Sequence, residues 1–140
     1  SRIKSPLSFL FMVMECFNRI NVHYGQQAGD AVLKQVSQLL NDRLRNSDVL
    51  ARYGGEEFVI LLADTSAEDA GLIAEQIRHR VEKTDFTIPS GKMIHATLSI
   101  GTATLAQHSH IHDTKSLVAA ADQAVYAAKL SGRNQVKQAR

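Results

Sequence analysis

Two neighbouring glutamates, Glu56 and Glu57, directly follow a pair of glycines, Gly54 and Gly55. Apolar runs lie on both sides of this segment, which predicts a tight β-hairpin in which both glycines adopt positive φ. Adjacent carboxylates at a hairpin tip can bind a divalent cation or accept a proton, and glycines beside them let a phosphate approach the backbone. The same residues also suit an ordinary hairpin with two solvated charges, so this segment alone leaves both interpretations open.

The elements that position this hairpin follow from hydrophobic periodicity and from turn residues. Strand patterns alternate with helix patterns, which together with one hairpin predicts an α/β (α+β) fold with a sheet covered by helices. The pattern predicts a buried strand over 7–14, helices over 18–24, 29–45 and 66–83 (opened by a capping box at Ser66), a long strand over 94–105, an alanine-rich helix over 114–130 capped by Ser131-Gly132, and a short strand over 135–138.

Size and composition limit the possible classes of protein. The chain has 140 residues, enough for one domain with a single core, and a formal net charge of +2, which gives no electrostatic case for binding nucleic acid. The single cysteine, Cys16, excludes an internal disulfide and suits a reducing compartment, and we expect a small packed thiol there. The apolar run over 7–14 is too short to span a bilayer and lacks the cleavage site of a signal peptide. We therefore expect a cytoplasmic domain that does not itself contact a membrane.

Motifs in four places resemble, in the same order, those of the GGDEF family, the diguanylate cyclases of bacteria. They lie at 17–30 (F-N-R-I-N, then Y-G and A-G-D), 52–58 (R-Y-G-G-E-E-F), 98–101 (L-S-I-G) and 121–134 (A-D-Q-A-V-Y-A-A-K, then S-G-R-N). The resemblance runs from about Pro6 to Val136. It implies a palm-like nucleotidyl cyclase fold, with a mostly antiparallel sheet, a βαββαβ core and the hairpin at the active edge. It also implies that residues 1–140 form one domain, the C-terminal piece of a larger signalling protein that carries sensory or EAL-type domains or a membrane anchor.

The resemblance implies a reaction and its ligands. The family joins two GTP molecules into cyclic di-GMP, with one GTP presented by each domain of a homodimer and with Mg²⁺ or Mn²⁺ as the metal. Glu56 matches the carboxylate that binds the metal and accepts the proton, and Glu57 matches a supporting acid. The backbone carbonyl of Met14 matches a further metal ligand. Substrate contacts map to Gly54 and Gly55 (α-phosphate), Asn21 and Asp30 (guanine), and Lys129 and Arg133 (phosphates).

A second constellation has the spacing of the family's inhibitory product-binding site. Arg45 and Asp48 form an R-x-x-D pattern shortly before the glycine pair. The resemblance implies that Arg45 contacts the guanine and phosphate of cyclic di-GMP and that Asp48 helps to hold the base. Some members add an arginine on the next helix, and Gln76 occupies that position here. A solvated loop with an Asx-type turn would leave the same pattern.

The chain departs from the family pattern at the end of the first strand. Val13 stands where the family has a metal-binding Asp, and Asn18 stands where it has a phosphate-binding Lys. Val22 and Gln26 replace an Asp and a His of the pattern. Glu15, two residues from Val13, points to the same face of a strand and is a possible substitute ligand. The departures favour impaired catalysis.

Three functional hypotheses remain open on the sequence. The first is a working cyclase in which Glu15 replaces the lost Asp. The second, which we favour, is a domain with impaired turnover, whose alternative role is to bind cyclic di-GMP at Arg45 and Asp48, or GTP, as a regulatory sensor. The third is a dimerisation domain without a ligand. His108, His110 and His112 alternate in a polar loop, which we interpret as a solvated segment rather than a zinc site.

Overall fold

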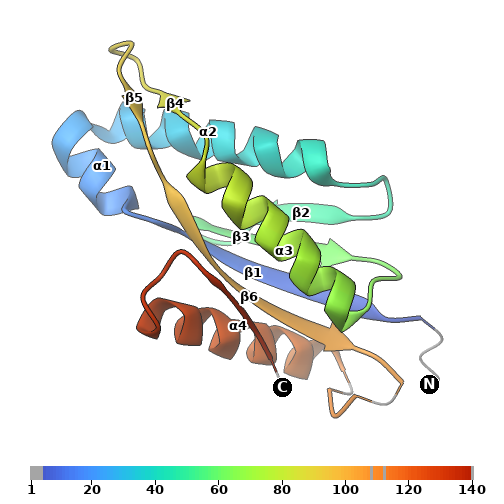
Figure 1. Ribbon diagram of the computed structural model, residues 1–140. Coiled ribbons are helices and arrows are strands. Elements are labelled where there is room, and N and C mark those ends of the chain that lie inside the picture. The colour runs from blue at the N-terminus through green and yellow to red at the C-terminus, as the bar shows by residue number, and fades with distance from the viewer. Residues whose placement is uncertain (1–4, 108, 112, 140) are drawn as a thin grey trace.

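The computed structural model describes residues 5–107, 109–111 and 113–139, and Figure 1 shows how they are arranged. Helices and strands alternate along the chain, as the sequence predicts. In order, the elements are β1 (Leu7–Glu15), α1 (Phe17–Tyr24), α2 (Gln26–Arg43), β2 (Val49–Arg52), β3 (Glu57–Leu62), α3 (Ala67–Glu82), β4 (Phe86–Thr87), β5 (Met93–Ile94), β6 (Thr97–Leu105), α4 (Thr114–Leu130) and β7 (Val136–Gln138).

β1 is the central strand of the main sheet, whose order is β2-β3-β1-β6-β7. It pairs antiparallel with β3 on one side and with β6 on the other. β2 and β3 are also antiparallel, whereas β6 and β7 are parallel. Every residue of β1 after Leu7 is buried. The predictions of a buried central strand and of a mostly antiparallel sheet with a βαββαβ core are confirmed.

The side chains of β1 alternate between two apolar layers, because successive residues of a strand point to opposite faces. Leu10, Met12 and Met14 belong to the larger layer, into which α2 and α3 pack. Phe9 and Phe11 belong to a second layer, which α4 covers. Figure 1 shows this division, with α1, α2 and α3 on one side of the sheet and α4 on the other. Burial of each such side chain contributes about 1.5–3 kcal/mol, so both layers hold β1 in place.

α4 approaches β6 most closely at Gly101. A Cβ atom at this position would lie 2.3 Å from the backbone nitrogen of Val125 and 2.4 Å from the carbonyl oxygen of Ala121. Both neighbours are helix backbone, which cannot turn aside as a flexible side chain can. The missing side chain at Gly101 therefore sets the depth at which α4 packs, and with it the position of the residues at the end of that helix.

Most predicted boundaries are correct, and the exceptions have local causes. The prediction of α2 as 29–45 is displaced, because the chain turns at Gly25 (φ 92°) and the helix starts immediately afterwards. It ends at Arg43, since Leu44 is extended. α3 begins as expected, with the Ser66 side chain accepting a hydrogen bond from the Asp69 backbone N–H (3.1 Å). α4 occupies the predicted 114–130.

The predicted long strand over 94–105 is wrong at its start. β6 begins at Thr97, and Ile94 belongs instead to β5, which pairs with β4 through Phe86 in a small separate hairpin. Two-residue strands are too short to produce an alternation that sequence reasoning could detect. Within the described residues, no helix is both long enough and apolar enough to cross a membrane.

We predict that Gly101→Ala lowers the free energy of unfolding by about 1–3 kcal/mol, because the added methyl group overpacks the contact between β6 and α4. Urea denaturation followed by circular dichroism measures this change. Gly71→Ala in α3 is the matched control, since its Cβ would meet only the Gln138 side chain, at 3.9 Å. We expect this control to be neutral or to stabilise the helix by about 0.5–1 kcal/mol. Equal stability of Gly101→Ala and the unmodified chain would contradict the packing argument.

Candidate active site

The tip of the hairpin is held against the end of β1. β2 and β3 form the hairpin that the sequence predicts. The backbone N–H of Tyr53 donates to the carbonyl of Glu57 (2.9 Å), and that of Met14 donates to the carbonyl of Glu56 (2.9 Å). The guanidinium of Arg52 donates to the backbone of the tip. Glu56 is therefore fixed where the central strand ends.

The prediction that both glycines adopt positive φ is wrong. Neither Gly54 nor Gly55 is among the described residues with positive φ, so the turn does not use their left-handed freedom. A Cβ atom at Gly54 would lie 2.6 Å from Oε1 of Glu57, the end of a flexible side chain that can turn aside. A Cβ at Gly55 would meet nothing beyond its chain neighbours within 4 Å.

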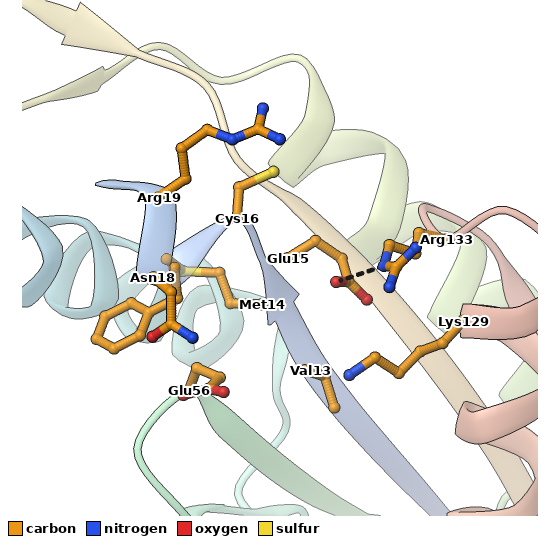
Figure 2. Close-up of a pocket in the computed structure, with 10 residues that line it drawn as sticks. Val13, Met14, Glu15, Cys16, Asn18, Arg19, Glu56, Lys129 and Arg133 are labelled. Atoms are coloured by element: carbon orange, nitrogen blue, oxygen red, sulfur yellow. Dashed lines mark ion pairs between the residues drawn. The ribbon is translucent and has the colours of Figure 1, made fainter. Parts of the chain in front are cut away.

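A cavity of about 480 Å³ opens at the carboxyl end of β1, beside the hairpin tip (Figure 2). Segments far apart in the sequence line it, namely the junction of β1 and α1, the hairpin tip and the end of α4. Of the predicted site residues, it brings together Met14, Glu15, Glu56, Lys129 and Arg133. The full lining is Val13, Met14, Glu15, Cys16, Phe17, Asn18, Arg19, Glu56, Lys129 and Arg133.

The two sides of this cavity differ in charge. Figure 2 shows Glu56 on the side of the hairpin and Lys129 and Arg133 on the side of α4. Among the predicted residues, Glu57, Gly54 and Gly55 belong to the hairpin but are not among the described residues that line the cavity. The arrangement therefore places the Glu56 carboxylate opposite Lys129 and the ion pair of Arg133 with Glu15, across a space large enough for a phosphate chain.

Val13 lies at the floor of this cavity, at the position that the family pattern gives to a metal-binding Asp. Its side chain is 6% exposed and packs in the apolar layer under α4. Within the described residues, no group of three or more His, Cys, Asp or Glu side chains comes together to hold a metal. One carboxylate, Glu56, and the main chain of Met14 remain, and Mg²⁺ is commonly held by one or two carboxylates completed by substrate phosphates. These residues fit a cation that binds together with a nucleotide, and not a site built by the protein alone.

Glu15 is almost fully buried and already has partners. Its side chain is 9% exposed, and its Oε1 lies 3.2 Å from Nε of Arg133. Its Oε2 accepts a hydrogen bond from the Ser99 hydroxyl (2.6 Å). Both carboxylate oxygens are therefore engaged by the protein, and the use of Glu15 as a substitute metal ligand stays a prediction.

The start of α1 adds positive potential to the cavity. Cys16 precedes the helix in a left-handed conformation (φ 67°), and the first turn has no side-chain cap and no acidic residue. The unpaired N–H groups of a helix N-terminus favour anions. Arg19 also lines the cavity, a residue that the sequence analysis missed. It lies one residue after Asn18, where the expected lysine is absent, and a helical step of three from Cys16 would have indicated its orientation.

The two predicted guanine contacts lie outside the lining of this cavity, on the neighbouring helices α1 and α2. The carbonyl oxygen Oδ1 of Asn21 is buried and has no hydrogen-bond partner among the described residues. A Cβ atom on Gly29 would lie 1.9 Å from this oxygen, so the glycine gives it room. Asp30 is exposed near the start of α2. An orphaned acceptor of this kind is expected to find a donor in a ligand or in water.

Arg45 and Asp48 are joined directly. Nε of Arg45 donates to Oδ2 of Asp48 (3.1 Å), Nη2 donates to Oδ1 (2.9 Å), and the backbone N–H of Arg45 also donates to Oδ2 (3.0 Å). Nη2 further donates to the carbonyl of Ala63 (2.7 Å) and to the hydroxyl of Thr65 (3.1 Å). Burial of the Asp48 carboxyl raises its pKa, but the hydrogen bonds and charge of Arg45 outweigh this and leave the pKa below its ordinary value. The side-chain bond to Asp48 in turn raises the pKa of Arg45.

Three further predictions concern Cys16, the histidine-containing loop and Gln76. The expectation of a packed thiol is wrong, because Cys16 is exposed at the edge of the cavity, where the strand-to-helix turn directs it outward. His108 and His112 lie outside the described residues, so the interpretation of that loop stays a prediction. Gln76, at the position of the further arginine that some members add to the product site, accepts a hydrogen bond from Arg43 (2.7 Å).

Comparison with known proteins decides the family. Residues 1–135 match the family model described as diguanylate cyclase, GGDEF domain. The chain belongs to the GGDEF family. Diguanylate cyclase DosC of Escherichia coli is 42% identical over 98% of this chain, and this GGDEF domain spans 29% of the length of that relative.

Solved structures agree with this assignment. The active GGEEF domain of a diguanylate cyclase from Vibrio cholerae is similar with a TM-score of 0.88 and 34% identity, over 98% of this chain and 85% of that one. The GGDEF domain of DgcB from Caulobacter crescentus, solved in complex with c-di-GMP, has a TM-score of 0.87 and 27% identity, over 96% and 78% of the two chains. The predicted palm-like fold of the family is confirmed, and the family as a whole requires a divalent metal.

We predict that the pairing of Arg45 with Asp48 stabilises the domain in a pH-dependent way. Because the native pKa of Asp48 is lowered, its contribution is complete above the unfolded pKa of about 3.9 and is lost as the pH falls through the native value. Asp48→Asn should therefore lower the free energy of unfolding by about 1–2 kcal/mol at pH 7. The difference from the unmodified domain should shrink below about pH 4. Urea denaturation at several pH values measures it, and a difference that grew on acidification would contradict the pairing.

Proposed function

We propose that this GGDEF domain binds GTP with a divalent metal in the cavity beside the hairpin and, as a homodimer, joins two GTP molecules into cyclic di-GMP with impaired turnover. The observation that carries the proposal is the meeting of Glu56, Lys129, Arg133 and the uncapped start of α1 around one cavity. That set of groups suits a metal-bound polyphosphate better than it suits a neutral ligand.

The guanine base would lie beyond the cavity, between α1 and α2. The buried, unpartnered Oδ1 of Asn21 can accept a hydrogen bond from the N1 or N2 edge of guanine, and the exposed carboxylate of Asp30 can accept another. Adenine offers no donor at the corresponding ring nitrogen, so the pair would also discriminate between the two purines. The ribose and α-phosphate would then reach Gly54 and Gly55 at the hairpin tip.

In the reaction that we propose, the 3′-hydroxyl oxygen of one GTP attacks the α-phosphorus of the other, and pyrophosphate leaves with the electrons of the broken P–O bond. Glu56 accepts the proton of the attacking hydroxyl. Glu57, on the same hairpin, is the neighbouring acid that supports the site. Lys129 and Arg133 bind the phosphates that leave. When bound, Mg²⁺ or Mn²⁺ would be held by Glu56, the Met14 carbonyl and phosphate oxygens, and it would neutralise charge on the triphosphate.

Two residues support impaired turnover. Val13 packs under α4 and offers no ligand to a cation, so the metal would depend on Glu56 and the nucleotide. Asn18 supplies no charge where the family pattern has a lysine, and Arg19, which also lines the cavity, directs its guanidinium away from Glu56 in Figure 2. Loss of one key electrostatic contact at an active site typically costs about 2.7–4 kcal/mol in the barrier, which is a fall of about a hundredfold to a thousandfold in rate.

The alternative is a binding module that senses cyclic di-GMP at Arg45 and Asp48. The two residues are in contact, and Arg45 is half-exposed with a side chain already held in one orientation. That preorganised arginine favours the alternative. Against it, the guanidinium bonds internally to Asp48, Ala63 and Thr65, so a ligand would have to use the remaining nitrogen or displace these partners.

We predict that the purified domain makes cyclic di-GMP slowly and that the double variant Val13→Asp/Asn18→Lys makes it at least about tenfold faster, because the variant restores one metal ligand and one phosphate cation. Chromatography of reactions with GTP and Mg²⁺ or Mn²⁺, at a protein concentration that permits dimerisation, measures the rate. Glu56→Gln is the negative control and should remove the activity of both forms.

The outcomes separate the hypotheses. Equal rates for the unmodified domain and the double variant would contradict impairment. Product from the double variant alone would leave the unmodified domain as a binding module, and calorimetry with cyclic di-GMP on Arg45→Ala would then test the alternative. No product from either form would contradict the proposal for this domain as a self-sufficient cyclase.

We predict that Asn21→Ala weakens GTP binding about threefold to tenfold and reduces the preference for GTP over ATP, since a neutral hydrogen bond to the base is lost. Competition against a fluorescent guanine nucleotide measures both quantities. Asn41→Ala, an exposed position on α2, is the matched control and should change neither. An unchanged ratio of GTP to ATP affinity would exclude Asn21 from base recognition.

A further inference from the structure

The loop that carries Arg133 adopts a strained conformation. After α4 ends, Gly132 has φ 120°, Arg133 has φ 64° and Asn134 has φ 47°. Left-handed backbone is uncommon outside glycine, and it persists where the surrounding structure holds it. The two consecutive non-glycine residues therefore need specific partners to keep this shape.

Asn134 supplies those partners through both its backbone and its side chain. Its Oδ1 accepts a hydrogen bond from Nη1 of Arg78 (2.9 Å), and its Nδ2 donates to Oε2 of Glu82 (2.8 Å). Both partners belong to α3, on the other side of the sheet from α4. The backbone N–H of Asn134 donates to the hydroxyl of Ser99 (3.2 Å), which itself donates to Glu15 (2.6 Å). One connected set of bonds thus runs from α3 to the cavity.

Arg78 is itself firmly placed. It pairs with Glu75 (2.6 Å) and with Glu82 (3.0 Å), and its side chain is 13% exposed. Its hydrogen bonds to Glu75 and then to Glu82 raise the pKa of its guanidinium, and the bond from Asn134 is the main cause that lowers the pKa of Glu82. Glu75, Arg78 and Glu82 are therefore charged at neutral pH, and two of them, Arg78 and Glu82, bond to the amide of Asn134.

Arg133 is held through its backbone and its side chain. Its backbone N–H donates to the carbonyl of Ala128 (2.9 Å), the next residue, Asn134, is tied to α3, and its Nε is paired with the buried Glu15 (3.2 Å). This pairing leaves the outer nitrogens of the guanidinium, which have no recorded partner among the described residues, available to the cavity. Figure 2 shows the Arg133 side chain beside Glu15 and close to the end of Lys129. The Arg133 side chain is 60% exposed, and a guanidinium paired through Nε can present its two outer nitrogens to a phosphate.

We propose that Arg78, Glu82 and Asn134 are positioning residues that aim Arg133 at the phosphates, and that Glu15 anchors the same arginine instead of binding a metal. The proposal rests on the proposed binding of a triphosphate in the cavity. Arg78 and Glu82 of α3 would touch no ligand themselves. The phosphate affinity of the cavity would nevertheless depend on this helix, which packs against the face of the sheet opposite α4.

A double-mutant cycle tests this arrangement. We expect Arg133→Ala to raise the Kd of a fluorescent non-hydrolysable GTP analogue about tenfold, and Arg78→Ala to raise it about threefold to fivefold. In the Arg133→Ala background, Arg78→Ala should have no further effect, because it acts through the missing side chain. Arg78→Lys, which can still donate to Asn134, should recover part of the affinity. Arg43→Ala, which removes another arginine bonded to α3, is the control and should leave the Kd unchanged.

A second readout does not depend on nucleotide. The NMR signal of the Arg133 Nε–H, which reports its ion pair with Glu15, should shift or broaden in Arg78→Ala and stay in place in Arg43→Ala. Thermal unfolding of every variant identifies any loss of folding.

Three results would overturn the proposal or part of it. An Arg133 signal unaffected by Arg78→Ala would overturn the positioning role, whatever happens to GTP binding. An equal loss of affinity in both backgrounds would show a general structural effect and would also overturn it. A signal that shifts in Arg78→Ala, combined with unchanged GTP affinity in Arg133→Ala, would contradict the phosphate role of Arg133 in the proposed function. It would leave the positioning of Arg133 by α3 intact.

Discussion

Everything chemical in this domain depends on the burial of β1 from both sides and on its hydrogen bonding to β3 and β6 at once. A strand in that position cannot shift by one residue without sending its apolar side chains to the wrong face. Its carboxyl end is therefore a fixed point, at which the hairpin tip, the start of α1 and the loop after α4 all meet. The depth of α4 over Gly101 then decides how far Lys129 and Arg133 extend over that point.

Val13 shows how such a frame accommodates an apolar residue where the family pattern has a carboxylate. At this position the strand ends between an apolar layer and a polar cavity, so a valine extends the layer under α4 without disturbing the pairing of β1. The stability of the fold does not require a carboxylate there, and a buried charge without a partner would reduce stability. Glu15, one pleat further on, avoids this cost because Ser99 and Arg133 satisfy both of its oxygens.

Local patterns in the sequence predicted the elements well, and the contacts between elements poorly. The capping residue Ser66, the apolar period of α2 and the alanine-rich run of α4 are signals carried within a few neighbouring residues. The hydrogen bonds that join Glu15, Ser99 and Asn134 depend instead on the register of β1 against β6 and on the path of the chain after α4. No short stretch of the sequence contains that information. The conformation of Gly54 and Gly55 was misjudged for a related reason, since the path of the backbone through the turn is decided by the folded hairpin.

The exposed side chain at the turn from β1 into α1 has a practical consequence. Cys16 is the sole thiol of the sequence, and it lies at the edge of the cavity that would receive the phosphates. A maleimide dye would therefore attach to the native chain at a single known place, with no need to remove other cysteines. The domain carries its own attachment point for a spectroscopic reporter, so the occupancy of its pocket can be followed in real time, separately from any turnover.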